Sequence, residues 1–265
     1  MQTSFKMLER HGRYLAPAAM FLLIVVAWEY APTLFSIPEF VLPRLSRVVA
    51  VLVDTRSIPV FFDNALVTLT EALAGLLIGG GLGLIFGIAL SQSRLLMATF
   101  YPYIVALQCM PKVALAPLLV IWFGFGLTSK IMVVALLCFF PMLVNTITGL
   151  RSVSRENLEL FQAIRAPVRA TLVHLYIPAA MPNILTGVEL AIVVSLLGAI
   201  VGEFVGAEKG LGVMLVQAQF QMNIPAVFAI LLILVALGLL FNLSVKLIRQ
   251  RLLFWIPQEA GQGRR

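Results

Sequence analysis

ELFQAIRAPVRATLVHLYIPAAMP, residues 159–182, is a polar segment that lies between two of the most apolar blocks of the chain. Its pattern predicts a helix, a break and a second helix. Ser154 can cap the first helix, and Pro167 disfavours helical backbone at the preceding Ala166. We expect Pro178 to end the second helix. Two short amphipathic helices at an angle would therefore project from whatever structure the apolar blocks form.

The composition assigns those blocks to a membrane. Of the 265 residues, 61% are hydrophobic and 12% are charged, whereas soluble domains have roughly 25% charged residues. A helix of about 20 apolar residues spans the ~30 Å hydrocarbon core of a bilayer. The chain is therefore predicted to be an all-α polytopic membrane protein, with residues 1–265 forming a single transmembrane domain. Six windows are predicted to span the membrane: 14–35, 71–91, 99–122, 130–150, 183–204 and 226–247.

The distribution of Lys and Arg predicts the orientation of the chain. Thirteen of the 19 lie on the face that holds both termini and the polar segment, and one, Lys112, lies inside a span. Because cytoplasmic segments are enriched in basic residues, we expect both termini in the cytoplasm, with the loop of residues 36–70 and the segment of residues 205–225 facing outward. The same bias explains the basic character of the chain, so we expect no nucleic-acid partner. The five basic residues of the outer face are Arg44, Arg47, Arg56, Lys130 and Lys209.

Glycine recurs at every fourth position in the second predicted span. This spacing places the glycines on one face of the helix, where the missing side chains allow another helix to approach closely. We predict a helix-packing surface there. Its residues are Gly75, Gly79, Gly83 and Gly87.

The third predicted span contains prolines, which kink a helix, and the charged Lys112. A lysine at the centre of a span costs roughly 2.5–3.5 kcal/mol on insertion scales, so Lys112 either reaches the head groups, lines a solute pathway or contacts a partner subunit. Glu203 is either exposed to water at the outer end of its span or part of a solute pathway. Glu189, near the cytoplasmic end of the same span, allows the same two interpretations. The pathway candidates are Gln108, Lys112, Asn145, Glu189 and Glu203.

The sequence offers no constellation for a metal or for catalysis. Cys109 and Cys138 lie in apolar runs, which is typical of packing residues. His11 and His174 lie far apart, without acidic or sulfur ligands at suitable spacing. The phosphate-binding pattern GxxxxGK[ST] does not occur. We therefore expect neither an enzyme nor a bound cofactor, and an ATP-driven activity would require a separate ATPase chain.

The polar segment resembles the cytoplasmic coupling loop of permeases from binding-protein-dependent ABC importers. The family pattern is Glu-Ala-Ala, three residues, Gly, nine residues, Ile, one residue, Leu-Pro, and its ends match Glu159 and Pro178. At the position of Arg165 the family has a glycine, which allows the chain to bend between the two short helices. In this sequence Ala166 and Pro167 can form that bend instead. The resemblance implies ATPase-coupling roles within residues 154–178 for Glu159, Phe161, Ile164, Arg165, Ala166, Pro167, Arg169 and Pro178.

Three further blocks, residues 110–131, 139–153 and 202–215, look like the nitrate, sulfonate and taurine group of these permeases. The resemblance implies the type I ABC importer permease fold in a bacterial inner membrane, with the coupling helices between the fourth and fifth spans. It also implies the partners: a second permease subunit in a homodimer, two ATPase subunits that bind ATP and Mg, and an extracytoplasmic solute-binding protein.

The function implied by the resemblance is ATP-driven import of a small polar or anionic organic solute. That solute is sulfonate-, taurine- or nitrate-like, or it is a pyrimidine-type vitamin precursor. Residues 111–117 look slightly more like the permeases for vitamin precursors. The alternative is a secondary transporter that does not use ATP. Such a protein predicts two internally related halves, and residues 1–150 show no clear repeat in residues 151–265.

Overall fold

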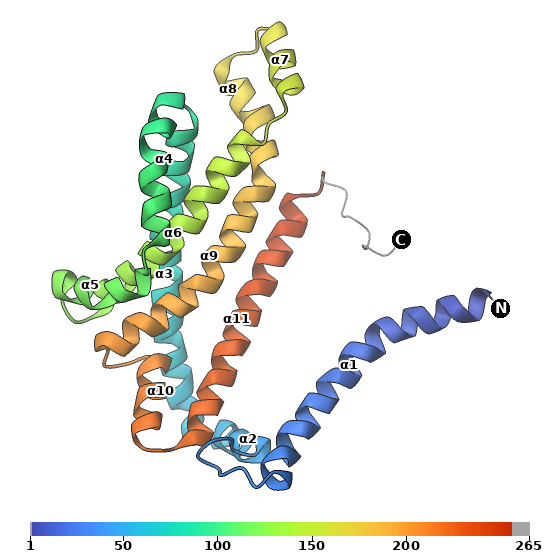
Figure 1. The fold of residues 1–265 in the computed structure, drawn as a ribbon, viewed down its shortest axis with the longest axis vertical. Helices are drawn as coiled ribbons and strands as arrows, with labels where there is room; N and C mark the ends of the chain where they lie inside the picture. Colours follow the sequence, from blue (N-terminus) through green and yellow to red (C-terminus); the bar gives the residue numbers. More distant parts are fainter. Residues whose placement is uncertain (1, 256–265) are drawn as a thin grey trace. The chain divides into compact units, whose positions relative to one another are not determined.

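Every regular element of the described chain is a helix. The computed structural model describes the backbone of residues 2–255 and the side chains of residues 16–255. This part of the chain contains no strand, which confirms the predicted all-α class. Along the chain (Figure 1) the α-helices are α1 (Gln2–Leu34), α2 (Leu45–Val53), α3 (Ser57–Ser91), α4 (Arg94–Cys109), α5 (Ala116–Phe123), α6 (Leu127–Arg151), α7 (Arg155–Ala163), α8 (Val168–Thr171), α9 (Ile177–Gly206), α10 (Leu211–Phe220) and α11 (Ile224–Leu252).

Among the described residues, five helices are long and apolar enough to cross a membrane, and a bent pair can supply a sixth span. In that pair, α4 and the helical run Lys112–Phe123 meet at 85°. The count agrees with the six predicted spans, but the third is broken rather than kinked. Met110 is extended because it precedes Pro111, which disfavours helical backbone at its neighbour. The five single spans are Ala16–Leu34, Ser57–Ser91, Leu127–Arg151, Val168–Gly206 and Ile224–Leu252.

The two segments predicted to face outward contain helices, and the second span begins earlier than residue 71, so its predicted start is wrong. α2 and the first turns of α3 lie within residues 36–70, and α10 lies within residues 205–225. The polar residues Asp63, Asn64 and Glu71 interrupt the apolar pattern of α3. A search for continuous apolar windows therefore begins the second span too late.

Within the body formed by residues 63–213, α3 and α6 pack through the glycine stripe. A Cβ atom on Gly79 would collide with the backbone of Ala135, and one on Gly83 would collide with the carbonyl oxygen of Phe139. The other two glycines of the stripe face side chains of α6 in the same way. Missing side chains thus allow the two helix backbones to come into contact.

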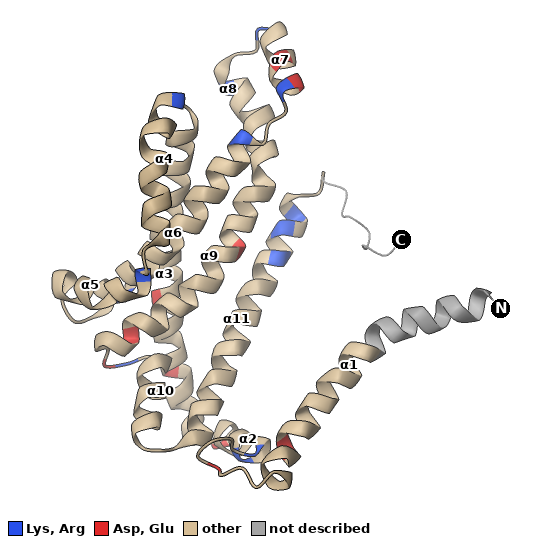
Figure 2. Cartoon of the chain, viewed as in Figure 1, with Lys and Arg blue, Asp and Glu red and all other residues tan. Residues whose placement is uncertain are grey.

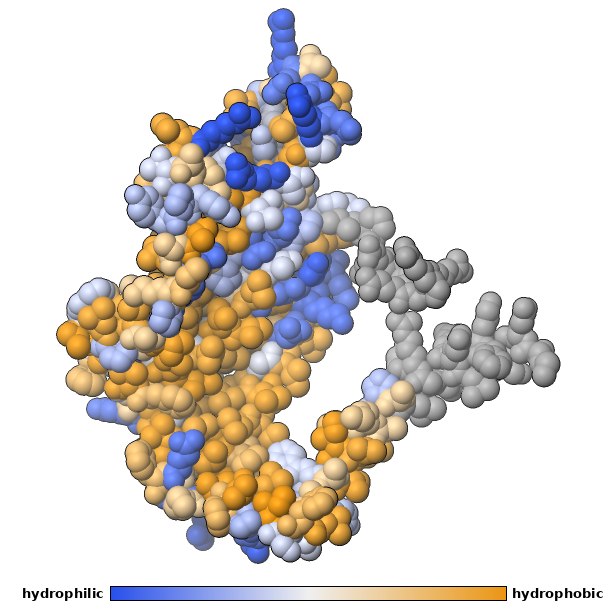
Figure 3. Space-filling view, in the orientation of Figure 1, coloured by the Kyte–Doolittle hydropathy of each residue, from blue (hydrophilic) through white to orange (hydrophobic). Residues whose placement is uncertain are grey.

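α9 runs beside α6 in Figure 1 and shares its core. Small buried side chains, among them Cys138, Ala191 and Ala199, form the contact. Figure 3 shows hydrophobic side chains over this body and a concentration of hydrophilic ones around α7 and α8. The polar loop therefore lies beyond the apolar ends of α6 and α9.

The contacts divide the described chain into two units, whose boundaries cross α3, α10 and α11. The first unit comprises the residues before Asp63 together with Met214–Ile233, and the rest form the second. In the first unit, Trp28 Nε1–H donates a hydrogen bond to the Pro43 carbonyl oxygen at 3.1 Å, and the Trp28 ring lies 5.7 Å from that of Phe228. The residues of the candidate site all belong to the second unit.

Candidate functional site

The loop between α6 and α9 has the predicted order of helix, bend and helix. Ser154 caps α7, because its hydroxyl oxygen accepts a hydrogen bond from the Asn157 N–H at 3.3 Å. Ala166 and Pro167 are not helical, and α8 begins at Val168. The predicted cap and the predicted position of the bend are both confirmed.

Arg165 forms the bend in the left-handed conformation, with φ of +50°. The Arg165 N–H donates to the Gln162 carbonyl oxygen at 2.9 Å, and the Ala166 N–H donates to that of Phe161 at 3.0 Å. Such bonds end many helices, usually with glycine in the left-handed position. Arg165 therefore adopts the left-handed backbone conformation that a glycine would adopt more easily, and a glycine is the residue that the coupling-loop pattern has at this position.

Replacing Arg165 by glycine should stabilise this bend. A left-handed conformation costs an ordinary residue roughly 1–2 kcal/mol, and glycine loses part of this gain through its greater freedom when unfolded. We expect a net gain of about 0.5–1 kcal/mol, measured as slower subtilisin cleavage between α7 and α8. Arg169→Gly, a change of the same kind inside α8, should accelerate cleavage. Equal changes in the cleavage rate of the two variants would contradict the explanation that the left-handed backbone of Arg165 destabilises the bend.

The knob, defined as residues 155–171, exposes apolar and basic side chains at one end of the second unit. Ile164 is 64% exposed and Val168 is 87% exposed. Arg155 pairs with Glu159 at 3.0 Å on the surface of α7, and Figure 2 shows the charged residues gathered there. Exposed apolar side chains rimmed by polar ones mark surfaces for protein contact. Of the remaining predicted residues, Arg165, Pro167 and Arg169 are exposed, and Phe161 and Ala166 are half-buried.

The prediction that Pro178 ends the second helix is wrong. α8 continues through a wider turn, Leu172–Tyr176, directly into α9, and the Ile177 N–H donates to the Leu172 carbonyl oxygen five residues back. In a regular α-helix the ring of Pro178 would clash with the carbonyl four residues before it. The wider turn lies just before the proline and gives its ring room, so the helix continues.

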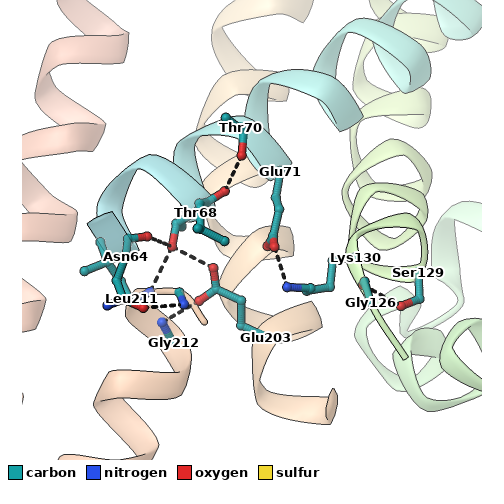
Figure 4. Close-up of polar contacts among 12 residues, drawn as sticks. Asn64, Thr68, Thr70, Glu71, Gly126, Ser129, Lys130, Glu203, Leu211 and Gly212 are labelled. Carbon is teal, nitrogen blue, oxygen red and sulfur yellow. Dashed lines mark hydrogen bonds and ion pairs between the residues drawn. The ribbon is translucent and has the colours of Figure 1, made fainter. Parts of the chain in front are cut away.

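A buried polar cluster, consisting of Thr68, Glu71, Lys130 and Glu203, joins α3, α6 and α9 (Figure 4). Lys130 Nζ lies 2.5 Å from Glu71 Oε1. The exposed fractions are 0% for Glu71, 5% for Lys130 and 2% for Glu203. Lys130, which was counted among the basic residues of the outer face, lies in the first turn of α6 and is buried in protein, where its ammonium group compensates the buried charge of Glu71.

Glu203 fixes the start of α10. The Thr68 hydroxyl donates to Glu203 Oε1 at 2.6 Å, and the Gly212 N–H donates to Oε2 at 2.5 Å. The Leu211 N–H donates in turn to Thr68 Oγ1 at 2.9 Å. The Glu203 carboxylate and the Thr68 hydroxyl thus each satisfy one N–H group that lacks a partner within the first turn of α10. The alternative that Glu203 is exposed to water at the end of its span is therefore wrong.

Asn64, Thr68 and Glu71 were not among the residues predicted from the sequence. They are spaced by four and three positions, which places them on one face of α3. Asn64 Oδ1 accepts a hydrogen bond from the Gly210 N–H at 2.7 Å. This polar stripe is a usable sequence signal, but it lies where the hydropathy pattern predicts the border between a loop and a span.

Two of the pathway candidates, Gln108 and Lys112, meet where the third span is broken. Lys112 Nζ donates to the Gln108 carbonyl oxygen at 3.0 Å and lies 4.8 Å from the centre of the Phe140 ring. The lysine thereby satisfies a carbonyl oxygen that the break leaves without its helical partner.

The other candidates have partners elsewhere. Glu189 of α9 accepts hydrogen bonds from Arg249 Nη1 of α11 at 2.9 and 3.0 Å. Asn145 Nδ2 donates to the Pro141 carbonyl oxygen of its own helix at 2.8 Å. The five candidates thus form no single lining, and Glu203 belongs to the buried polar cluster.

The fold is that of solved importer permeases. A chain of the methionine ABC transporter, solved in an inward-facing conformation, superposes with a TM-score of 0.67 at 18% identity, over 75% of this chain and 99% of that one. A chain of an amino acid ABC transporter gives a TM-score of 0.59 at 18% identity, over 78% and 98%. These likenesses confirm the expected fold.

The sequence comparisons give the family. The chain is 35% identical to the formylaminopyrimidine transport permease protein of Halalkalibacterium halodurans, over 94% of this chain and 98% of that protein. It is 34% identical to a riboflavin transport system permease protein of Chloroflexus aurantiacus, over 88% and 87%. It is 31% identical to a putative aliphatic sulfonates transport permease protein of Bacillus subtilis, over 88% and 84%. A family model described as "binding-protein-dependent transport system inner membrane component" matches residues 79–254, and the chain belongs to that family.

Proposed function

We propose that this chain is the permease subunit of an ATP-driven importer and that the knob transmits the action of a separate ATPase. The observation that supports this most directly is the exposure of Ile164 and Val168 at the tip of a helix pair that continues without interruption into a membrane span. A rigid helical continuation allows a displacement of the knob to reach the span. The chain itself would hydrolyse no ATP.

The assembly that we propose is a homodimer of permeases with two ATPase subunits, which bind ATP and Mg, and an extracytoplasmic solute-binding protein. Both termini and the knob would face the cytoplasm, since the Lys and Arg residues of the sequence concentrate in these segments. Two permease copies would enclose the solute pathway on their two-fold axis.

The solute that we propose is a small polar or anionic organic molecule. The relatives are named for formylaminopyrimidine, riboflavin and aliphatic sulfonates, which share polar ring or acidic groups. Lys112, which is half-buried at the broken span, supplies a cation. We propose Gln108 and Lys112 as part of the pathway lining; Lys112→Ala with unchanged uptake of all three solute classes would exclude Lys112.

Val168→Asp tests the knob. Burying a valine side chain in an interface contributes about 1.5–3 kcal/mol, and a carboxylate there adds a desolvation cost. We expect at least about a tenfold drop in the ATPase that co-purifies with the permease. Phe220→Asp, a similar change at an exposed residue of α10, should leave recovery unchanged.

Full ATPase recovery with Val168→Asp would show that the knob is not the coupling surface. A wild-type chain that recruits no ATPase at all would instead favour the secondary transporter. The two failures are therefore distinct.

A further inference from the structure

A small cavity with two arginines opens between α4 and α6 at the end of the second unit that carries the knob. Its volume is about 260 Å³. Arg94 stands at the first position of α4, and Arg151 at the last position of α6. Figure 2 shows basic residues at both helix ends. The remaining lining residues are Met97, Ala98, Tyr101 and Pro102.

The charge in this cavity is not balanced. Within the part of the chain whose side chains are described, neither Arg94 nor Arg151 forms an ion pair; the four ion pairs lie elsewhere. The position of Arg94 is also electrostatically unfavourable, because the N-terminus of a helix already carries a partial positive charge. An anion in the cavity would be stabilised by both guanidinium groups and by the α4 dipole.

The wall of the cavity is suited to a lipid. Met97 is buried, and Pro102 and the half-exposed ring of Tyr101 continue an apolar surface along α4. Both helices belong to membrane spans that end here, so the arginines lie at the level where head groups begin. Tyrosine and arginine are typical of this boundary, and basic pockets between spans bind anionic head groups.

We propose that Arg94 and Arg151 hold the phosphate of an anionic phospholipid, whose acyl chains lie along Tyr101 and Pro102. The lipid would occupy the leaflet on the side of the knob. Arginine suits this role because its planar group donates two parallel hydrogen bonds to phosphate oxygens. This site is independent of the proposed transport function, because it requires no partner protein and no solute.

The test titrates the purified full-length permease in a neutral detergent and counts bound lipid by native mass spectrometry. The probes are phosphatidylglycerol, phosphatidylcholine with the same acyl chains, and inorganic phosphate. We expect phosphatidylglycerol to bind more tightly than phosphatidylcholine, and the double variant Arg94→Gln/Arg151→Gln to weaken only that binding, by about 30-fold. The charge-matched control is Arg47→Gln/Arg56→Gln, whose arginines do not line this cavity.

Each alternative result overturns the proposal in its own way. Equal affinity for the two lipids would exclude a charge-selective site. Equal weakening by the control variant would assign the effect to net charge rather than to the cavity. Inorganic phosphate that displaces phosphatidylglycerol at equal concentration would identify a free-anion site without lipid. Tryptophan fluorescence unfolding curves of both double variants verify that they are folded.

Discussion

Lys130→Met is expected to remove most of the folded permease from the membrane extract. The change leaves Glu71, which is 0% exposed, without its ion-pair partner, and Glu203 lies in the same cluster. Removing one member of a buried pair costs about 3–5 kcal/mol, out of a total stability of about 5–15 kcal/mol. The measurement is the yield of monodisperse protein in mild detergent, together with its midpoint of thermal unfolding. Lys209→Met, at an exposed lysine, should change neither.

A second substitution separates charge from packing. Glu71→Leu/Lys130→Met removes both members of the pair and replaces them with apolar groups of similar volume, which is often neutral or stabilising for buried pairs. We expect the double variant to recover most of the stability lost in Lys130→Met. A double variant as unstable as the single one would show that the packing of the lysine stem, and not the buried carboxylate, dominates.

Gly79→Ala is expected to destabilise the contact between α3 and α6 by about 2–3 kcal/mol, the upper part of the range for overpacked cores. The added Cβ would meet the backbone of Ala135, which cannot rotate away as a side chain can. The two helices must therefore separate. Thermal unfolding of the purified permease measures the loss.

Gly81→Ala is the matched control on the same helix. No atom lies within 4 Å of a Cβ built at Gly81, so this variant gains the helix propensity of alanine, about 1 kcal/mol, without a collision. The two alanines should therefore shift the unfolding midpoint in opposite directions. Shifts of the same sign would mean that the stripe does not determine the distance between the helices.

The sequence was sufficient for the features that depend on neighbouring residues. The Ser154 cap, the bend at Ala166–Pro167 and the run of apolar spans follow from local chemistry and appear in the structure. The glycine spacing also identified a face of α3, although not the helix that covers it. These predictions needed no knowledge of which segments meet in space.

The features that sequence reasoning missed depend on distant contacts. Glu71 and Lys130 are 59 positions apart, and only the packing of α3 on α6 brings them within 2.5 Å. Pro178 was expected to end a helix because a single proline usually does, yet a wider turn before it allows the helix to continue. In both cases the folded neighbourhood overrides a sound local rule.

The wider turn at Leu172–Tyr176 also has a geometric consequence for the knob. It holds one residue more per turn than the α-helix on either side of it, and in an α-helix each residue turns the chain by about 100° and advances it by about 1.5 Å. Deleting a single residue there would turn the knob by about 100° about the axis of α9, and it would also bring the ring of Pro178 against the carbonyl group four residues before it. The length of this turn therefore sets the direction in which the knob faces, and Pro178 keeps that length from being shortened without strain.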